Sequence, residues 1–329
     1  MLLTHFPTGS MGAVTPGSPP RANGTPVSEF LLEGLTDEKE LKLVLFTIFL
    51  LVYIVALAGN LGITSLIIVD PRLHTPMYFF LANLSLLDAA YVSNSVPQVL
   101  AHLLAAQRLI SYGACLTQMF FLHFLAPWEC FLLTAMAYDR YAAICRPLHY
   151  LVLMGPRTRA TLASISCLLA LTNALTHTLL ATKLDFCGPR LITHFFCDLP
   201  PLLKLSCSST QPNELGLFFF SFVVALIPCA LVVVSYVNVV AAILRIRSAE
   251  GRHKAFSTCA AHLTMVCIFY ITSVLCYILP SSSYSRTRNR VFAVLYTIIT
   301  PMLNPIIYSM RNKEVKRAVY KVLGREGTA

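Results

Sequence analysis

The sequence predicts an all-α membrane protein: a seven-transmembrane helix bundle with a short amphipathic helix after span seven. Hydrophobic residues make up 56% of the 329-residue chain and charged residues only 12%, whereas soluble domains are about a quarter charged. The apolar residues gather in separate runs, each longer than the roughly 17 residues that a spanning helix needs. Because each run must satisfy its own backbone in lipid, helices are expected and a barrel of short alternating strands is not.

The spans are predicted at residues 41–69, 77–100, 115–138, 160–182, 215–244, 259–280 and 291–310. Residues 1–40 then form an extracellular tail, 41–310 the transmembrane domain, and 311–329 a cytoplasmic tail. Most Lys and Arg residues follow spans one, three, five and seven, so the carboxyl terminus is predicted in the cytoplasm of a multi-pass plasma-membrane protein. This bias, with anionic inner-leaflet lipid, also explains the net charge of +10, and nucleic acid is an unnecessary partner.

The amino-terminal tail is expected to be disordered. It lacks the apolar core of a cleavable signal, so the first span is expected to act as an uncleaved signal anchor. Asn23-Gly24-Thr25 is a sequon on the predicted outer side, which makes Asn23 the expected glycosylation site. Met1 and Met11 are both candidate starts.

Carboxyl groups interrupt the apolar surface of two predicted spans. Asp88 lies near the middle of span two and Glu129 within span three. Two carboxylates in hydrocarbon would cost about 2.5 to 3.5 kcal/mol each on the insertion scale. They should therefore share a proton, a cation or buried water, and the alternative is a merely structural protonated pair. In span one, Gly59-Asn60 favours close helix packing.

Span three ends in an adjacent acid and base, Asp139 and Arg140. Eleven residues, about three helical turns, separate Glu129 from Arg140, so both belong to one inward face. The same face carries Leu122, Ala126, Leu133 and Met136. A charge pair where the span meets the basic side can switch partners, although boundary charges can also merely snorkel to water.

Four cysteines lie on the predicted extracellular, oxidising side: Cys115, Cys187, Cys197 and Cys207. Their spacing does not choose among the three pairings. On the inner side, His253, Cys259 and His262 lack zinc-ligand spacing, so no transition-metal site is expected. Since no catalytic motif appears, an enzyme is not expected. Residues 311–323 alternate basic and apolar positions, which predicts a helix along the inner membrane surface.

Five stretches together closely resemble the vertebrate olfactory receptors, a branch of the rhodopsin-like G-protein-coupled receptors. They are Leu73–Phe80 leading to Asp88, Met136–Tyr141, Ser235-Tyr236, Lys254–Cys259 with His262-Leu263, and Pro301–Tyr308. The resemblance covers roughly Asn23 to Ala318.

The resemblance implies roles for particular residues. It implies disulfides Cys115–Cys197 and Cys187–Cys207. It implies an inner switch in which Arg140 releases Asp139 and, with Tyr236 and Tyr308, helps to form the cavity that receives the G-protein α-subunit. It also implies a central site of Asp88, Glu129 and Asn304, where an allosteric sodium ion stabilises the resting state; no other cofactor is expected.

The resemblance further places an odorant pocket among spans three, five, six and seven. The matching positions are Leu122, His123, Ala126, Phe220, Ser221, Val224, Tyr270, Ser273, Val274, Tyr277 and Thr297. Leu122 stands where amine receptors have an aspartate, so a cationic amine is disfavoured. A small, volatile, mainly apolar ligand is expected, although plain helix packing competes with ligand contact at each position.

Two residues depart from the family pattern. Cys167 stands where tryptophan is usual, and Ile271 where glycine is common. The leading hypothesis is an odorant receptor that activates the stimulatory olfactory G protein and raises cyclic AMP. A small transporter is the alternative from another class, but no similarity between halves is found. A non-signalling scaffold, or a receptor that fails to reach the surface, would keep the fold.

Overall fold

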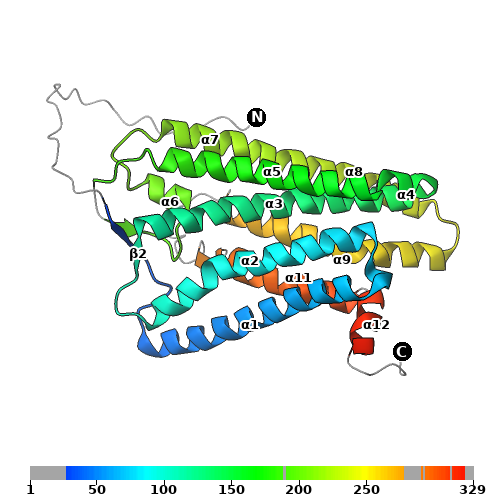
Figure 1. Cartoon of the computed structure of the whole chain (residues 1–329), viewed down its shortest axis with the longest axis horizontal. Coiled ribbons are helices and arrows are strands. Elements are labelled where there is room, and N and C mark those ends of the chain that lie inside the picture. The colour runs from blue at the N-terminus through cyan, green and yellow to red at the C-terminus, as the bar shows by residue number, and fades with distance from the viewer. Residues whose placement is uncertain (1–26, 188–189, 278–289, 292, 312, 323–329) are drawn as a thin grey trace.

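Figure 1 shows the computed structural model as a bundle of long helices lying side by side, with a small sheet at one end and α4 and α12 at the other. The structure describes residues 27–187, 190–277, 290–291, 293–311 and 313–322. Asn23, the predicted glycosylation site, and the candidate starts Met1 and Met11 lie outside these ranges.

The bundle is built from α1 (Lys39–Val69), α2 (Pro76–Leu104), α3 (Tyr112–Cys145), α5 (Pro156–Ala181), α7 (Gln211–Ser221), α8 (Ile227–Leu244), α9 (Ala249–Tyr277) and α11 (Thr300–Arg311). Shorter helices are η1 (Pro71–Leu73), η2 (Pro147–His149), α4 (Tyr150–Leu153), α6 (Leu199–Leu203) and α12 (Lys313–Val322). There are two π-turns in the described residues. The turn η3 (Phe222–Leu226) joins α7 to α8, and the turn η5 (Leu295–Ile299) leads into α11. The strands are β1 (Glu29–Leu32), β2 (Leu109–Ser111) and β3 (Leu191–Ile192).

Each predicted span corresponds to a helix of the bundle, which confirms the predicted fold class. Among the described residues, α1, α3, α5 and the α7–η3–α8 rod are individually long and apolar enough to cross a membrane. Helix α9 is bent by 41° between Ser257 and Cys259. If its two parts are taken as one helix, it is a fifth helix long and apolar enough to cross a membrane. It begins at Ala249 rather than at the predicted 259, because hydropathy marks only the apolar part of a helix.

The outward surface of the bundle is apolar. Leu43 on α1 is 64% exposed, and Leu231, Val234 and Val237 on α8 are also exposed. Such a continuous apolar surface is costly in water and is typical of lipid-facing helices. On α12, by contrast, Val315 and Ala318 are buried, as an amphipathic helix requires; its position on the membrane surface stays a prediction.

Helix α1 packs closely against α11 at Gly59 and Asn60. The Asn60 side chain donates hydrogen bonds of 2.9 Å to the carbonyls of Ala56 and Pro301. A Cβ atom built on Gly59 would lie 2.8 Å from Cγ of Pro305, closer than side-chain atoms pack. The small residue and the interhelical amide therefore set this contact, which agrees with the packing interpretation of the sequence.

Gly59→Leu is expected to destabilise the bundle by about 1 to 3 kcal/mol, because the new side chain must push α11 away. The measurement is the thermal unfolding midpoint of the purified protein. Gly62→Leu on the same helix is the matched control, since a Cβ there has no atom within 4 Å. Equal midpoints for the two variants would contradict this account of the α1–α11 contact.

The end of the bundle that carries the sheet forms a cap with a hydrophobic core of its own. Strand β1 lies between β2, which is antiparallel to it, and β3, which is parallel. Phe30 and Ile192 are buried there with Cys115, Cys197 and Leu199. The prediction of a disordered tail is therefore wrong for residues 29–32, because pairing with two distant loop strands orders them.

His194 is a half-buried titratable group in this cap. Its ring packs against Phe195 and Phe196, with centroids 4.8 and 4.2 Å away, and its Nδ1 has no hydrogen-bond partner among the described residues. Burial and the positive charge of Arg290, which is paired with Glu33 at 2.5 Å, lower the pKa of His194 to about 4. The folded cap therefore favours the neutral imidazole.

Acid is expected to destabilise the cap through His194. Because the folded-state pKa lies below the usual 6.5, the cap keeps its full stability above pH 6.5. It loses stability progressively as the pH falls from 6.5, and the loss is complete near pH 4. The loss at pH 5 is about 2 kcal/mol. Thermal midpoints at pH 7 and pH 5 should therefore differ less in His194→Phe than in the wild type. His149, which is exposed at the opposite end of the bundle, gives the control His149→Phe. An unchanged acid sensitivity in His194→Phe would contradict the prediction.

Candidate functional site

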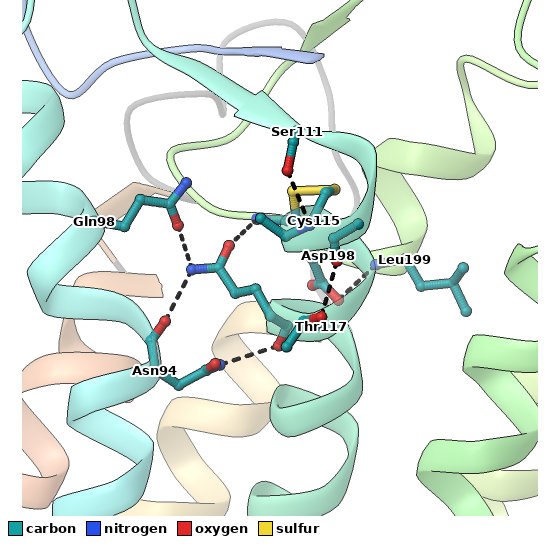
Figure 2. The surroundings of a disulfide bond; sticks show 11 residues. Asn94, Gln98, Ser111, Cys115, Thr117, Asp198 and Leu199 are labelled. Carbon is teal, nitrogen blue, oxygen red and sulfur yellow. Dashed lines mark hydrogen bonds between the residues drawn. A yellow bond between two sulfur atoms is a disulfide. The ribbon is translucent and has the colours of Figure 1, made fainter. Parts of the chain in front are cut away.

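The amino end of α3 is linked by a disulfide bond to the loop between α5 and α7. The structure joins Cys115 to Cys197 and Cys187 to Cys207, the pairing that the resemblance implied. Figure 2 shows the polar network beside the first bond. Gln118 accepts a 2.8 Å hydrogen bond from the backbone N–H of Cys197 and donates to the carbonyl of Asn94 and to the side chain of Gln98. Helices α2 and α3 and the loop are therefore held at one point.

Several candidate ligand residues come together between α3, α5 and α7. Leu122 is buried, and the next residue, His123, lies beside His177 of α5 with ring centroids 4.9 Å apart. His177 in turn contacts Phe220 of α7 at 5.3 Å. The Asn173 side chain donates a 2.6 Å hydrogen bond to the carbonyl of His123. The sequence did not single out His177, because one histidine in an apolar run carries no pattern.

The tautomer of neutral His123 follows from its hydrogen bond. Nδ1 lies 3.0 Å from the carbonyl oxygen of Met119. Since a carbonyl only accepts, Nδ1 carries the proton and Nε2 has a lone pair to offer. In His177, which is buried, Nδ1 has no partner among the described residues. These imidazoles are the polar groups that a small ligand could engage here.

The other predicted lining residues divide into two groups. Tyr270 bonds to the Cys130 thiol at 3.2 Å, and that thiol also donates to the carbonyl of Val224 at 2.9 Å. Ser273 and Thr297 donate instead to carbonyls of their own helices, each at 2.7 Å.

Four further predicted lining positions add little to this picture. Ala126 is half-buried and Ser221 is exposed. Ser221 directly precedes the π-turn η3, and a π-turn interrupts the regular α-helical spacing of side chains. The side chains of Val274 and Tyr277 lie outside the described part.

Asp88, Glu129 and Asn304, the residues of the expected central polar site, are all buried. Asp88 and Glu129 are buried and lie close enough for their charges to interact. The amide of Asn304 donates a 2.5 Å hydrogen bond to Oδ2 of Asp88. Oδ1 of Asp88 and Oδ1 of Asn304 have no hydrogen-bond partner in the described residues. Buried oxygens with spare lone pairs are the ligands that a hard cation prefers, so these residues fit a sodium ion.

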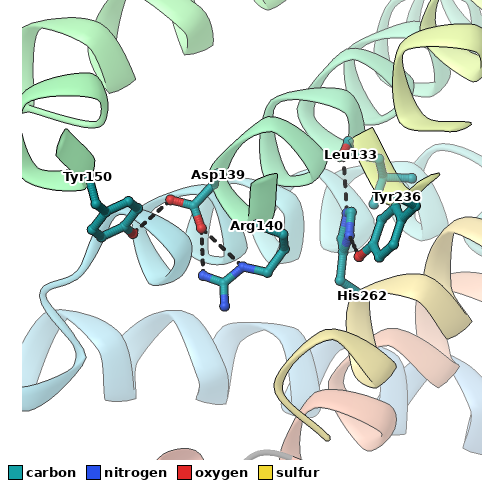
Figure 3. Close-up of polar contacts among 6 residues, drawn as sticks. All are labelled: Leu133, Asp139, Arg140, Tyr150, Tyr236 and His262. Atoms are coloured by element: carbon teal, nitrogen blue, oxygen red, sulfur yellow. Dashed lines mark hydrogen bonds and ion pairs between the residues drawn. The ribbon is translucent and has the colours of Figure 1, made fainter. Parts of the chain in front are cut away.

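Asp139 and Arg140 form a closed pair at the inner end of α3. Oδ2 of Asp139 accepts from Nη2 of Arg140 at 2.5 Å and from Nε at 3.1 Å, while Oδ1 accepts from the hydroxyl of Tyr150 at 2.8 Å. Figure 3 shows the carboxylate held between the arginine and the tyrosine. Both oxygens are satisfied, so the pair is a charge-assisted buried contact rather than a snorkelling one.

A second inner contact links α8, α9 and α3. Nε2 of His262 lies 3.1 Å from the carbonyl of Leu133, and Nδ1 lies 2.6 Å from the hydroxyl of Tyr236 (Figure 3). The carbonyl requires a proton on Nε2, so Nδ1 accepts from the tyrosine. Tyr308, the other predicted switch tyrosine, is buried and its hydroxyl lacks a partner within the described ranges.

The inner cluster therefore contains two residues that the sequence did not assign to it. His262 belongs to a stretch that resembles the family, but its sequence pattern suggests no role other than that of a possible metal ligand. Tyr150 follows the predicted span by several residues, and only the turn through η2 brings it back to Asp139. Neither His253, which is exposed, nor buried Cys259 has a described contact with the His262 ring.

The helix bundle, with its buried polar core and the charge pair on α3, has the fold of the rhodopsin-like seven-helix membrane proteins. The crystal structure of squid rhodopsin matches with a TM-score of 0.67 over 87% of this chain and 81% of that one, at 15% identity, and shows the fold alone.

The sequence profile of the olfactory receptor family matches residues 49–326. Olfactory receptor 3A1 of Homo sapiens is 52% identical over 309 residues, covering 94% of this chain and 98% of the relative. Olfactory receptor 3A3 of Pan troglodytes is 53% identical over 301 residues, covering 92% and 96%. The chain belongs to the olfactory receptor family and is a multi-pass plasma-membrane receptor, not an enzyme.

Proposed function

We propose that this receptor binds a small, uncharged, mainly apolar odorant among α3, α5, α7 and α9, and then activates a stimulatory olfactory G protein that raises cyclic AMP. The observation that carries the proposal is the closed Asp139–Arg140 pair beneath the candidate pocket. A buried ion pair that holds a resting arrangement supplies the two-state element that ligand-driven signalling needs.

The pocket favours a ligand with an apolar body and one hydrogen-bonding oxygen. Leu122 offers no counter-charge to an amine, and the hydroxyls of Ser273 and Thr297 are occupied by their own helices. Nε2 of His123 can accept a proton from a ligand hydroxyl. His177 can donate or accept, depending on its tautomer.

The inner face supplies features that suit a protein partner. Leu148, Leu151 and Val152 beside the Asp139–Arg140 pair are strongly exposed apolar residues, and such patches are typical of docking surfaces. When Arg140 leaves Asp139, the unpartnered hydroxyl of Tyr308 is a candidate acceptor. Asp88, Glu129 and Asn304 would hold a sodium ion in the resting arrangement, where it would neutralise buried negative charge.

The test is an odorant panel on cells that express the receptor with the olfactory G protein, with cyclic AMP and surface staining as readouts. A dose-dependent rise is expected in the wild type and in the control Arg157→Ala, whose arginine is exposed on the same side. Arg140→Ala at matched surface level should lose the response. A response that survives in Arg140→Ala would contradict the switch, and odorant flux without cyclic AMP would favour the transporter.

A further inference from the structure

A groove of about 430 Å³ lies between the inner halves of α8 and α9. Its α8 wall consists of Tyr236, Val239, Val240 and Ile243, and its α9 wall of His253, Phe256, Ser257, Cys259, Ala260 and Leu263. These residues recur at three- and four-residue spacing, so each helix presents one continuous face. The walls are mostly apolar, and the more polar side chains of His253 and Ser257 lie towards the cytoplasmic end.

The groove opens towards the lipid-facing side of the bundle. Val240 is 36%, Leu263 38% and Phe256 41% exposed. Helix α8 next to the groove continues the exposed apolar surface with Val233 and Val237. In a membrane these residues meet hydrocarbon, so an acyl chain can enter the groove without crossing water.

Positive charge gathers where the groove meets the cytoplasm. The turn after α8 and the first turns of α9 carry Arg245, Arg247, Arg252 and Lys254 against one carboxylate, Glu250. Arg245 and Arg247 are exposed and Arg252 is half-exposed. None of these three arginines has a carboxylate within ion-pair distance among the residues that the structure describes. Their charge is therefore available to an external anion.

We propose that this groove is a binding site for one anionic phospholipid of the inner leaflet. Its acyl chain lies along Val240, Ala260 and Leu263, and its headgroup lies at the three arginines and His253. Basic pockets between helices on the cytoplasmic side suit such headgroups, and each nearby basic residue strengthens the attraction. A zwitterionic lipid fits the apolar walls equally well but gains less from the arginines. The proposal is independent of which odorant the receptor binds.

The test measures which lipid the purified full-length receptor retains. Receptor in detergent is incubated with an equimolar mixture of phosphatidylserine and phosphatidylcholine of the same acyl composition, and native mass spectrometry identifies the first bound lipid. At least a fivefold excess of phosphatidylserine is expected for the wild type. The triple variant Arg245→Gln, Arg247→Gln, Arg252→Gln should lose most of this excess. Ala260→Phe, which fills the groove, should reduce retention of both lipids.

A matched control removes the same charge elsewhere on the inner face. Arg157→Gln, Lys316→Gln, Arg317→Gln changes three exposed residues on α5 and α12 and should keep the full excess. A wild type without preference would overturn the proposal, as would an equal loss in the two triple variants, because general surface charge would then explain it. Unchanged retention in a folded Ala260→Phe would overturn the location. If that variant does not fold, as judged by its thermal midpoint, the two triple variants decide.

Discussion

Cells that express Cys115→Ser, Cys197→Ser are expected to show almost no receptor at the surface. The bond closes a segment whose ends lie 82 residues apart, and by the chain-entropy relation such a link contributes about 4.5 kcal/mol. That is a large part of the stability of an ordinary domain. The bond also holds the backbone of Cys197 where its N–H meets Gln118. Its loss should therefore separate the cap from α3.

The second disulfide provides the comparison. Cys187 and Cys207 are 20 residues apart, and the same relation gives about 3.3 kcal/mol. The variant Cys187→Ser, Cys207→Ser should therefore retain about 1 kcal/mol more stability and a higher thermal midpoint. Surface staining and the thermal midpoint measure the two effects. If the Cys187→Ser, Cys207→Ser variant instead had the lower surface level and the lower thermal midpoint, the role assigned to the Cys115–Cys197 bond would be wrong.

His262→Leu is expected to raise cyclic AMP in the absence of any odorant. The substitution removes both hydrogen bonds that tie α9 to α3 and α8. It also leaves the hydroxyl of Tyr236 without a partner in a buried place. Buried hydrogen bonds of this kind are worth about 1 to 3 kcal/mol, which corresponds to about 5- to 150-fold in the ratio of active to resting receptor.

Basal cyclic AMP per surface receptor is the readout for this prediction. His253→Leu lies on the same helix, but its side chain is exposed, so its basal signal should equal that of the wild type. Tyr236→Phe removes one of the two hydrogen bonds and should give a smaller rise. A His262→Leu receptor with full odorant response and an unchanged basal signal would show that this contact does not hold the resting state.

The sequence predicted the spans and the inward face of α3 because hydropathy and the 3.6-residue period act locally. Glu129, Leu133 and Met136 are buried on that face as expected. The sheet escaped prediction, because strands of two to four residues at positions 29, 109 and 191 have no periodicity of their own. Their pairing exists only once the helices have brought the loops together.

Side-chain pairing was the part of the site that sequence could not supply. The candidate hydroxyls Ser273 and Thr297 lie in the expected helices, but which acceptor a hydroxyl uses depends on its rotamer, and both bond to their own backbone. The contacts of His177 and His262 depend on which helices are neighbours. The disulfide pairing was reached only through the resemblance, since spacing left three choices.

The π-turn at Phe222–Leu226 has a consequence for insertions and deletions. A π-turn holds one residue more than an α-turn, so deleting one residue there restores an ordinary helix and leaves α8 in place. Deleting a residue within α8 instead rotates everything beyond it by about 100°, which would turn Tyr236 away from His262. Among homologous genes, a single-codon insertion or deletion in this helix should therefore fall within the codons for residues 222–226.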